Sequence, residues 1–283
     1  MHTLRHETVP LDAAELFCGY GGATAGMLAA GLSVRLAVDY DRRAVAAHRA
    51  WHPGVPVRCQ DVRQVRPAEL AGRFVWASPS CRPWSLANTS GPRGVAHPEY
   101  FDLCALADRA ILSHVLVIEN VSGLAWTSQG KAELARLWEW CDYYGRPVQL
   151  VHAWAHQFGV RQFRRRVFVI VGASSPVVLD QAAMSHAELG HLSHEGQDAL
   201  SHRAQLSQAV TTRTGGNVSQ LAELQGILNP RELLVPDTRS GRRRESSHRL
   251  VNTHTSRRLI GNAVPPEMAR GVCLAVRRAV GWH

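Results

Sequence analysis

The residue best suited to covalent chemistry is Cys81, in the segment SPSCRPWS. It follows the apolar run FVWA at 74–77 and precedes a loop rich in Ser, Gly and Pro, where a thiolate could act as a nucleophile. A free cysteine is more often a small buried hydrophobe, and that alternative predicts apolar neighbours. Because the neighbours are Ser80, Arg82 and Ser85, the sequence favours a thiol that faces a cleft.

Two other segments place charged groups next to apolar runs. Glu119 follows VLVI, where burial of a carboxylate is costly without a partner, which favours a ligand contact or a raised pKa. The alternative for this residue is a helix cap. Further on, strict alternation in QFRRR puts Gln162, Arg164 and Arg166 on one side of an extended segment, although adjacent arginines usually form a solvated edge.

A glycine-rich segment, ELFCGYGGATAG, follows a predicted strand and opens a predicted helix. Gly19, Gly21 and Gly22 would let the backbone pass close to a ligand, and the turn alone fits a dinucleotide, an S-adenosyl ligand or no ligand. Asp39 ends the next strand about twenty residues on, where a carboxylate can accept hydrogen bonds from ribose hydroxyls. Asp61 follows a third strand and could bind an adenine amine, and either aspartate could instead cap a helix.

These segments belong to an alternation of apolar runs and helical patterns in the first 172 residues. The predicted strands include 11–17, 34–38, 74–77, 111–120 and 165–172, and the predicted helices include 24–31, 41–52 and 131–144. This order predicts a doubly wound α/β sheet of Rossmann-like type, whose ligand site lies at the carboxyl ends of the strands.

The pattern changes after residue 172. Residues 173–254 are rich in His, Ser, Gln, Thr and Gly and sustain no period, so we expect a small, loop-rich domain inserted in the first. A helical pattern with Pro near its first turn returns at 266–280, after GNAVPP. The expected division is 1–172 plus 255–283 for one domain and 173–254 for the other.

Composition bounds the class of protein. The 283 residues, 45% hydrophobic and 19% charged, can bury a full core, and the formal charge of +9 comes almost entirely from arginine, because Lys131 is the only lysine. An arginine-rich chain suits a polyanionic partner, but a GC-rich genome gives the same bias, and we weigh the two equally.

No apolar run resembles a signal peptide or a membrane span, so we expect a cytoplasmic protein that does not bind membranes. The six cysteines form no C-x-x-C pair and are expected to be free thiols. The histidines at 186, 191, 194 and 202 lack cysteine partners or a second spaced pair, so a polar loop is favoured over zinc and we expect no metal.

Taken together and in order, the motifs resemble those of the cytosine-5 DNA methyltransferase family, in its bacterial or phage form with a short target-recognition region. ELFCGYGG is similar to the cofactor loop, PSCRPWS to the P-C-Q-P-F-S nucleophile loop, ENV to the glutamate motif, QFRRR to Q-x-R-x-R, and GNAVPP to the C-terminal motif. They frame about two-thirds of the chain, and their order on the expected elements is what makes the resemblance specific.

The resemblance implies a role for each motif residue. Catalysis would use Cys81, Glu119, Arg164 and Arg166. S-adenosylmethionine, with S-adenosylhomocysteine as product, would be bound by Phe17, Gly19, Gly21, Gly22, Asp39, Tyr40, Asp61, Val62, Asn262 and Val264. Double-stranded DNA would be bound by Arg82, Ser85, Gln162, Arg213, Arg242 and Arg243, although a solvated charge run is the commoner explanation for any one of these arginines.

The implied reaction methylates C5 of a flipped-out cytosine through a covalent bond between Cys81 and C6. The enzyme is expected to be a monomer, with a cognate restriction endonuclease as a candidate partner. The alternatives are a cytosine-5 methyltransferase of transfer RNA, a DNA-binding homologue that has lost catalysis and, on the glycine turn alone, a nicotinamide-dependent dehydrogenase.

The sequence departs from the family pattern around the nucleophile. Ser80 stands in place of proline, Arg82 in place of glutamine and Trp84 in place of phenylalanine, and HPEYFDLC has no clear match to the family's R-G-x-L motif. The nucleophile is retained, while the stiffness of its loop and its contacts to the base are put in doubt. The short target-recognition region predicts a recognition site of about two to four base pairs, because fewer residues reach fewer base edges.

Overall fold

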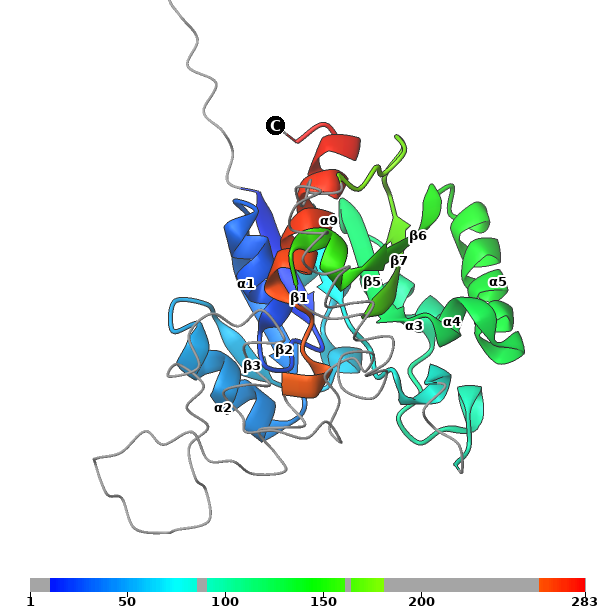
Figure 1. Cartoon of the computed structure of the whole chain (residues 1–283), viewed down its shortest axis with the longest axis horizontal. Coiled ribbons are helices and arrows are strands. Elements are labelled where there is room, and N and C mark those ends of the chain that lie inside the picture. The colour runs from blue at the N-terminus through cyan, green and yellow to red at the C-terminus, as the bar shows by residue number, and fades with distance from the viewer. Residues whose placement is uncertain (1–10, 86–90, 161–163, 181–259, 283) are drawn as a thin grey trace, which may run out of the picture.

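The sheet that carries these motifs has seven strands in the order β3-β2-β1-β4-β5-β7-β6 (Figure 1). This computed structural model describes residues 11–85, 91–160, 164–180 and 260–282. The strands are β1 (Asp12–Leu16), β2 (Ser33–Asp39), β3 (Val57–Cys59), β4 (Phe74–Ala77), β5 (Val115–Val121), β6 (Val148–Trp154) and β7 (Arg165–Val171). The chain therefore has the α/β class predicted from its sequence.

The sheet is mixed, because one strand runs against the others. β1 to β5 pair in parallel, whereas β7 is antiparallel to both β5 and β6. The chain moves outward from β1 through β2 to β3 and then returns to β4 on the other side of β1. The order of the strands thus reverses between β1 and β4. A crevice forms at the carboxyl ends of two such strands, and folds of this type bind ligands there.

The sequence did not predict β6. In VQLVHAW most side chains are only partly buried, and Gln149 and His152 interrupt the apolar run, as suits an edge strand with one neighbour. Gln149 also bonds the backbone of the residues that follow β7: its side-chain Nε2 donates to the carbonyls of Ala173 and Ser175, and its Oε1 accepts from Val177 N.

Helices cover both faces of the sheet. They are α1 (Gly22–Ala29), α2 (Arg42–Trp51), α3 (Leu103–Arg109), α4 (Gly123–Trp126), α5 (Ser128–Tyr143) and α9 (Pro266–Ala279). One core cluster joins the sheet to α1 and α9, and a second joins its other face to α3 and α5. The described helices include none long and apolar enough to cross a membrane.

The helix predicted at 266–280 is α9, and it packs beside α1 (Figure 1). Gly26 permits the close approach, since a Cβ atom there would lie 2.5 Å from the Cβ of Ala269. This packing brings the turn before α9, with Asn262 and Val264, back to the loop between β1 and α1, although the two segments are far apart in the sequence.

Candidate active site

The strand register aligns the ends of four neighbouring strands. Leu16 of β1 pairs with Val38 on one side and Ala77 on the other, and Ala77 pairs with Ile118 of β5. The next residue of each strand or loop therefore lies at one edge of the sheet. These residues are Phe17, Asp39, Ser78 and Glu119. Phe17, Asp39 and Glu119 are predicted site residues, and Ser78 directly precedes the nucleophile motif PSCRPWS.

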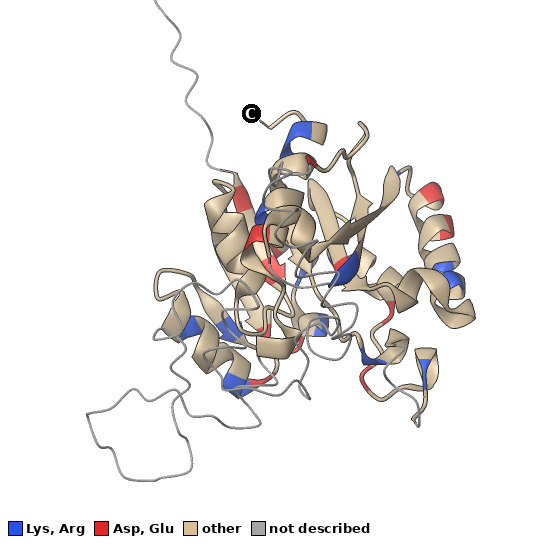
Figure 2. Ribbon diagram, in the orientation of Figure 1, with Lys and Arg blue, Asp and Glu red and all other residues tan. Residues whose placement is uncertain are grey.

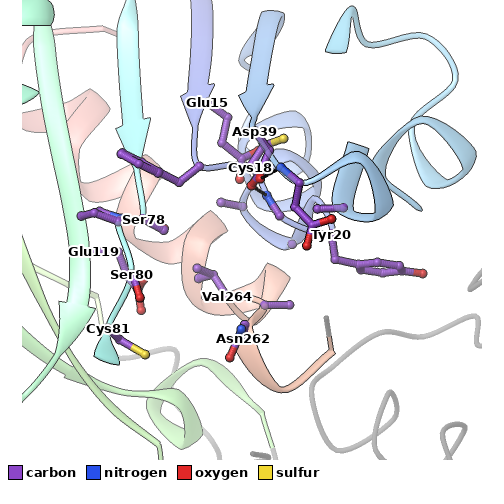
Figure 3. A pocket seen from close by; sticks show the side chains of 18 of the residues that line it. Glu15, Cys18, Tyr20, Asp39, Ser78, Ser80, Cys81, Glu119, Asn262 and Val264 are labelled. Carbon is purple, nitrogen blue, oxygen red and sulfur yellow. Dashed lines mark hydrogen bonds between the residues drawn. The ribbon is translucent and has the colours of Figure 1, made fainter. Parts of the chain in front are cut away.

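A cleft opens at this edge (Figure 3). Twelve of the residues expected at the site line it: Phe17, Gly19, Gly22, Asp39, Tyr40, Cys81, Arg82, Glu119, Arg164, Arg166, Asn262 and Val264. Gly21, Asp61, Val62 and Ser85 do not line it. Gln162, Arg213, Arg242 and Arg243 lie outside the described residues, as do the four histidines at 186, 191, 194 and 202.

Cys81 lies in the loop that follows β4, with its side chain in the cleft (Figure 3). The loop is held from both sides: Asn120 Nδ2 donates to the carbonyl of Pro79 (3.2 Å), and Trp84 N donates to the carbonyl of Cys81 (3.1 Å). Burial raises the pKa of the Cys81 thiol, while the guanidinium groups of Arg166 and Arg164 lower it and Glu119 adds to the rise. The resting group is therefore a thiol rather than a thiolate.

Glu119 has the partner that its position at a strand end requires. Arg166 Nε lies 2.9 Å from Glu119 Oε1, and the two side chains are only 11% and 9% exposed. The pair forms because Arg166 of β7 lies opposite Val121 of β5, on the same side of the sheet as Glu119. Glu119 is not a helix cap, since the next helix begins after Ser122.

Arg164 holds the opposite wall of the cleft. Its Nη1 donates to the carbonyl of Gly261 (3.1 Å) and its Nη2 to that of Ala263 (3.2 Å), which fixes the turn that carries Asn262 and Val264. Complete burial, with the nearby charge of Arg166, lowers the pKa of Arg164 to about 9. Arg164 thus fixes this turn, and it lines the same cleft as Arg166.

The loop after β1 is shaped by its own backbone and by Asp39. Phe17 has a positive φ of 58°, a strained conformation for a bulky residue, and its ring packs edge-on against Phe101 at 5.0 Å. Asp39 accepts from Gly19 N (2.9 Å) and from Asp41 N (2.8 Å), so its carboxylate ties the ends of β1 and β2 together.

The same end of the cleft has features that fit S-adenosylmethionine. A Cβ on Gly22 would lie 2.1 Å from the carbonyl oxygen of Val264, so only glycine lets the loop meet this turn. Tyr40 is 68% exposed and lies at the cleft edge, where its ring could stack on an adenine. Asp39 and Asp41 supply acidic groups to the lining, which suits a ligand that carries a sulfonium and an ammonium group.

Three residues expected to bind the cofactor, Gly21, Asp61 and Val62, do not line the cleft, and each has other contacts. Asp61 accepts from Arg63 N (2.8 Å) and caps the 3-10 turn Val62–Gln64, which is the helix-cap alternative. Val62 is 3% exposed and packs in the core. Gly21 begins α1 in the left-handed conformation, and its carbonyl accepts a hydrogen bond from the ring of His52.

Sequence reasoning missed two acidic residues that line the cleft, Glu99 and Glu15. Glu99 lines the cleft beside Arg82, and it lies in the segment HPEYFDLC, where no motif was found. Glu15 is buried beneath the glycine loop and hydrogen-bonds Thr24. Glu15 is the first residue of the ELFCGYGG motif, and that position was the available signal for it. Among the described residues, no cluster of three His, Cys, Asp or Glu could hold a metal ion.

A glycine loop after β1, a carboxylate ending β2 and a cleft at the switch point define a Rossmann-like α/β protein with a ligand site at the carboxyl ends of its strands. The profile of the C-5 cytosine-specific DNA methylase family matches residues 11–225, and the chain belongs to this family. The resemblance seen in the motifs is thereby confirmed.

Curated relatives of the chain are named as Type II methyltransferases. The chain is 32% identical to Type II methyltransferase M.AquIA of Picosynechococcus over 177 residues, which cover 55% of this chain and 69% of the relative. It is 30% identical to Type II methyltransferase M.NgoPII of Neisseria gonorrhoeae over 170 residues, which cover 57% of this chain. That match spans 48% of the Neisseria protein, about half its length.

Solved structures share the fold at low sequence identity. The Dnmt2 methyltransferase of S. pombe has a TM-score of 0.62 at 16% identity, over 96% of this chain and 99% of that one. The methyltransferase EhMeth of Entamoeba histolytica has a TM-score of 0.64 at 11% identity, over 95% of this chain and 98% of that one.

Proposed function

We propose that this chain transfers a methyl group from S-adenosylmethionine to C5 of a cytosine in duplex DNA, with Cys81 as the nucleophile. The observation that carries the proposal is the presence, in one cleft, of Cys81, the Glu119–Arg166 ion pair and the glycine loop tied to Asp39. These groups suit the two halves of the reaction. One end of the cleft has a nucleophile and two charged side chains that can contact a cytosine, and the other end has a glycine loop that can bind the methyl donor.

Cytosine C5 is a weak nucleophile, and covalent catalysis overcomes this. The Cys81 thiol first loses its proton to a base, and the thiolate then forms a bond to C6, which turns the ring into an enamine whose C5 attacks an electrophilic methyl group. S-adenosylmethionine supplies that methyl group and leaves as S-adenosylhomocysteine. A base then removes the proton from C5, the C6–S bond breaks, and Cys81 departs with the bonding electrons as a thiolate.

The ion pair stabilises the charge that develops on the base. Attack at C6 pushes electron density toward N3 and O2, so we place Glu119 at N3 and the N4 amine, and Arg166 at O2. Glu119 takes up a proton in this step, so its ion pair with Arg166 is replaced by contacts of both side chains with the base. Arg166 is also within the electrostatic range that lowers the pKa of Cys81, so one guanidinium favours both the thiolate and the adduct. Arg164 acts indirectly, through the carbonyls of Gly261 and Ala263.

On the cofactor side, we propose that Asp39 binds the ribose and that Tyr40 packs against the adenine, with Asp61 and Val62 at the adenine edge. Phe17 and Gly19 would line the floor, and Gly22 would set the spacing to the turn with Asn262 and Val264. Asp39 is already held by two backbone amides, so it is oriented before the ligand arrives.

A base inside a duplex cannot reach Cys81, so the cytosine must flip out at a cost of a few kcal/mol. Basic residues on α2 and at the start of β7 lie at the carboxyl edge of the sheet, where they suit the phosphates beside a flipped base (Figure 2). We propose Arg82, Ser85 and Gln162 as contacts near the base, and residues 173–254, with Arg213, Arg242 and Arg243, as the domain that reads sequence.

Bisulfite sequencing of a plasmid methylated by this protein tests the extent of recognition. We expect a methylated site of about two to four base pairs, because a region of this length presents few side chains to base edges. A six-base-pair motif would contradict that expectation.

Transfer of tritiated methyl groups to defined duplexes and to transfer RNA tests the reaction itself. The parent chain should label duplex DNA, the Cys81→Ser variant should not, and the Cys59→Ser variant should behave as the parent, because Cys59 is exposed and outside the cleft. Label in RNA alone would favour a transfer RNA methyltransferase. DNA binding without any methyl transfer by the parent would favour a binding protein that has lost catalysis.

A further inference from the structure

Ser80 and Arg82 flank the nucleophile, and one carboxylate contacts both. Ser80 Oγ donates to Glu99 Oε2 (2.6 Å), and Arg82 Nη1 donates to Glu99 Oε1 (2.7 Å). The Ser80 hydroxyl also accepts from Arg82 N at 3.4 Å. Glu99 therefore connects the residues on either side of Cys81, and the contact between Arg82 N and Ser80 completes a ring of hydrogen bonds around the nucleophile.

Glu99 is itself held on a braced segment. Its backbone N donates to His97 Nδ1 (3.0 Å). The next residue, Tyr100, donates its hydroxyl to Glu133 of α5 (2.9 Å), and the same carboxylate accepts from Leu103 N (2.8 Å). Glu133 is 2% exposed, so this attachment is internal and ties the segment that carries Glu99 to α5.

We propose that Glu99 is a positioning residue, which fixes Cys81 against the incoming base by clamping Ser80 and Arg82. Ser80 and Arg82 occupy the positions where similar nucleophile loops have proline and glutamine, so the clamp takes over the stiffening that proline would give. Arg82 is then held by Glu99 in the cleft wall before DNA binds, rather than being an unpaired cation.

This inference deepens the proposed function, because the position of Cys81 matters only if Cys81 attacks the base. Two measurements separate the two ideas. The first is alkylation of each cysteine by iodoacetamide, followed by mass spectrometry, which needs no methyl transfer. The second is the rate of covalent adduct formation on duplexes containing 5-fluorocytosine, which trap the adduct because C5 carries no removable proton.

The Glu99→Ala variant should move the two measurements in opposite directions. Release of the loop exposes the thiol and should raise the alkylation rate of Cys81 several-fold, while the buried Cys18, Cys141 and Cys273 stay unlabelled. Adduct formation should slow about 10- to 100-fold, as expected for a displaced reacting group, with KM for S-adenosylmethionine unchanged. Glu99→Gln keeps an acceptor for Ser80 but no charge for Arg82, so both of its rates should lie between those of Glu99→Ala and the parent.

Glu69→Ala is the matched control. Glu69 also bonds two arginines, Arg58 and Arg66, but it does not line the cleft. Its loss should lower stability without changing the labelling of Cys81. Equal Cys81 labelling and adduct rates in Glu99→Ala and the parent would overturn the proposal.

A double-mutant comparison tests whether Glu99 acts through its partners. In a Ser80→Ala/Arg82→Ala background, the further Glu99→Ala change should have little effect on the adduct rate, because the clamp is already lost. Multiplying effects would mean that Glu99 touches the substrate directly and would overturn the proposal. If the parent neither methylates nor traps DNA, the proposed function fails, and the Cys81 labelling pattern still confirms or refutes the clamp.

Discussion

The carboxyl of Glu15 should make stability fall as pH rises, and replacing it with glutamine should remove that fall. Glu15 is 2% exposed beneath the glycine loop, where the hydroxyl of Thr24 lies between it and His48 Nε2 (3.0 Å from Thr24 Oγ1). Burial, opposed in part by the hydrogen bond from Thr24, raises the pKa of Glu15 from 4.5 to about 8. Burial also lowers the pKa of His48 from 6.5 to about 3, with neighbouring His52 acting in the same direction.

The two shifts act over different pH ranges. Between pH 6.5 and 8 the unfolded chain has an ionised Glu15 and the folded protein a protonated one, so unfolding releases a proton and stability falls as pH rises. At about 1.4 kcal/mol per pH unit, the loss over this range is roughly 2 kcal/mol. Between pH 4.5 and 6.5 the unfolded chain protonates His48 while the folded protein does not, and this opposite slope cancels that of Glu15.

Urea titrations at half-unit steps from pH 4.5 to 8.5 measure the free energy of unfolding for both proteins. Relative to Glu15→Gln, the parent should lose about 2 kcal/mol between pH 6.5 and 8. The variant should also gain a rising slope between pH 4.5 and 6.5, where only His48 titrates. Glu69→Gln is the control, because the arginine partners of Glu69 lower its pKa to about 2 and confine its effect to pH below 4.5. Parallel curves for the parent and Glu15→Gln would refute the reasoning.

Three further changes test the walls of the cleft. Arg164→Met should lower stability by about 2–4 kcal/mol, through two lost hydrogen bonds from a charged donor, and should raise KM for S-adenosylmethionine; denaturation and steady-state kinetics measure both, and an unchanged KM would contradict the positioning role. Gly22→Ala should lower the melting temperature and cofactor affinity together, because its Cβ would lie 2.1 Å from Val264 O, and a variant as stable as the parent would show that the turn yields freely. Tyr40→Ala should weaken S-adenosylmethionine binding several-fold in calorimetry while leaving stability within about 0.5 kcal/mol, since the ring is 68% exposed, and equal affinity would remove Tyr40 from the adenine site.

The sequence predicted those parts of the site that depend on local order. Cys81, Glu119 and Asp39 each follow an apolar run, and parallel strands bring their carboxyl ends to one edge whatever the details of packing. The class of the fold followed from the same alternation. β6 was missed because an edge strand with partly buried faces has neither a continuous apolar run nor clean alternation.

Contacts between distant segments could not be predicted in this way. Alternation placed Arg164 and Arg166 on one side of the chain, and both line the cleft, but it did not give their partners: Arg166 pairs with Glu119, and Arg164 bonds a turn 97 residues further on. The difference arises from the return of α9 to α1, which no local pattern specifies. Likewise, the partner of Ser80 and Arg82 lies 19 and 17 residues away, in a segment whose composition resembles an ordinary loop.

The contact between Glu99 and the nucleophile loop also changes what the unusual motif means. A proline restricts the backbone in every solvent condition, whereas a carboxylate holding a hydroxyl and a guanidinium depends on charge. The Arg82–Glu99 pair is substantially exposed, at 60% and 36%, so salt should weaken that arm more than the hydrogen bond to Ser80. DNA phosphates would compete for Arg82 in the same way, which couples the order of the nucleophile loop to occupation of the cleft. Ser80 and Arg82 are therefore better understood as partners of Glu99 than as signs of a degraded motif.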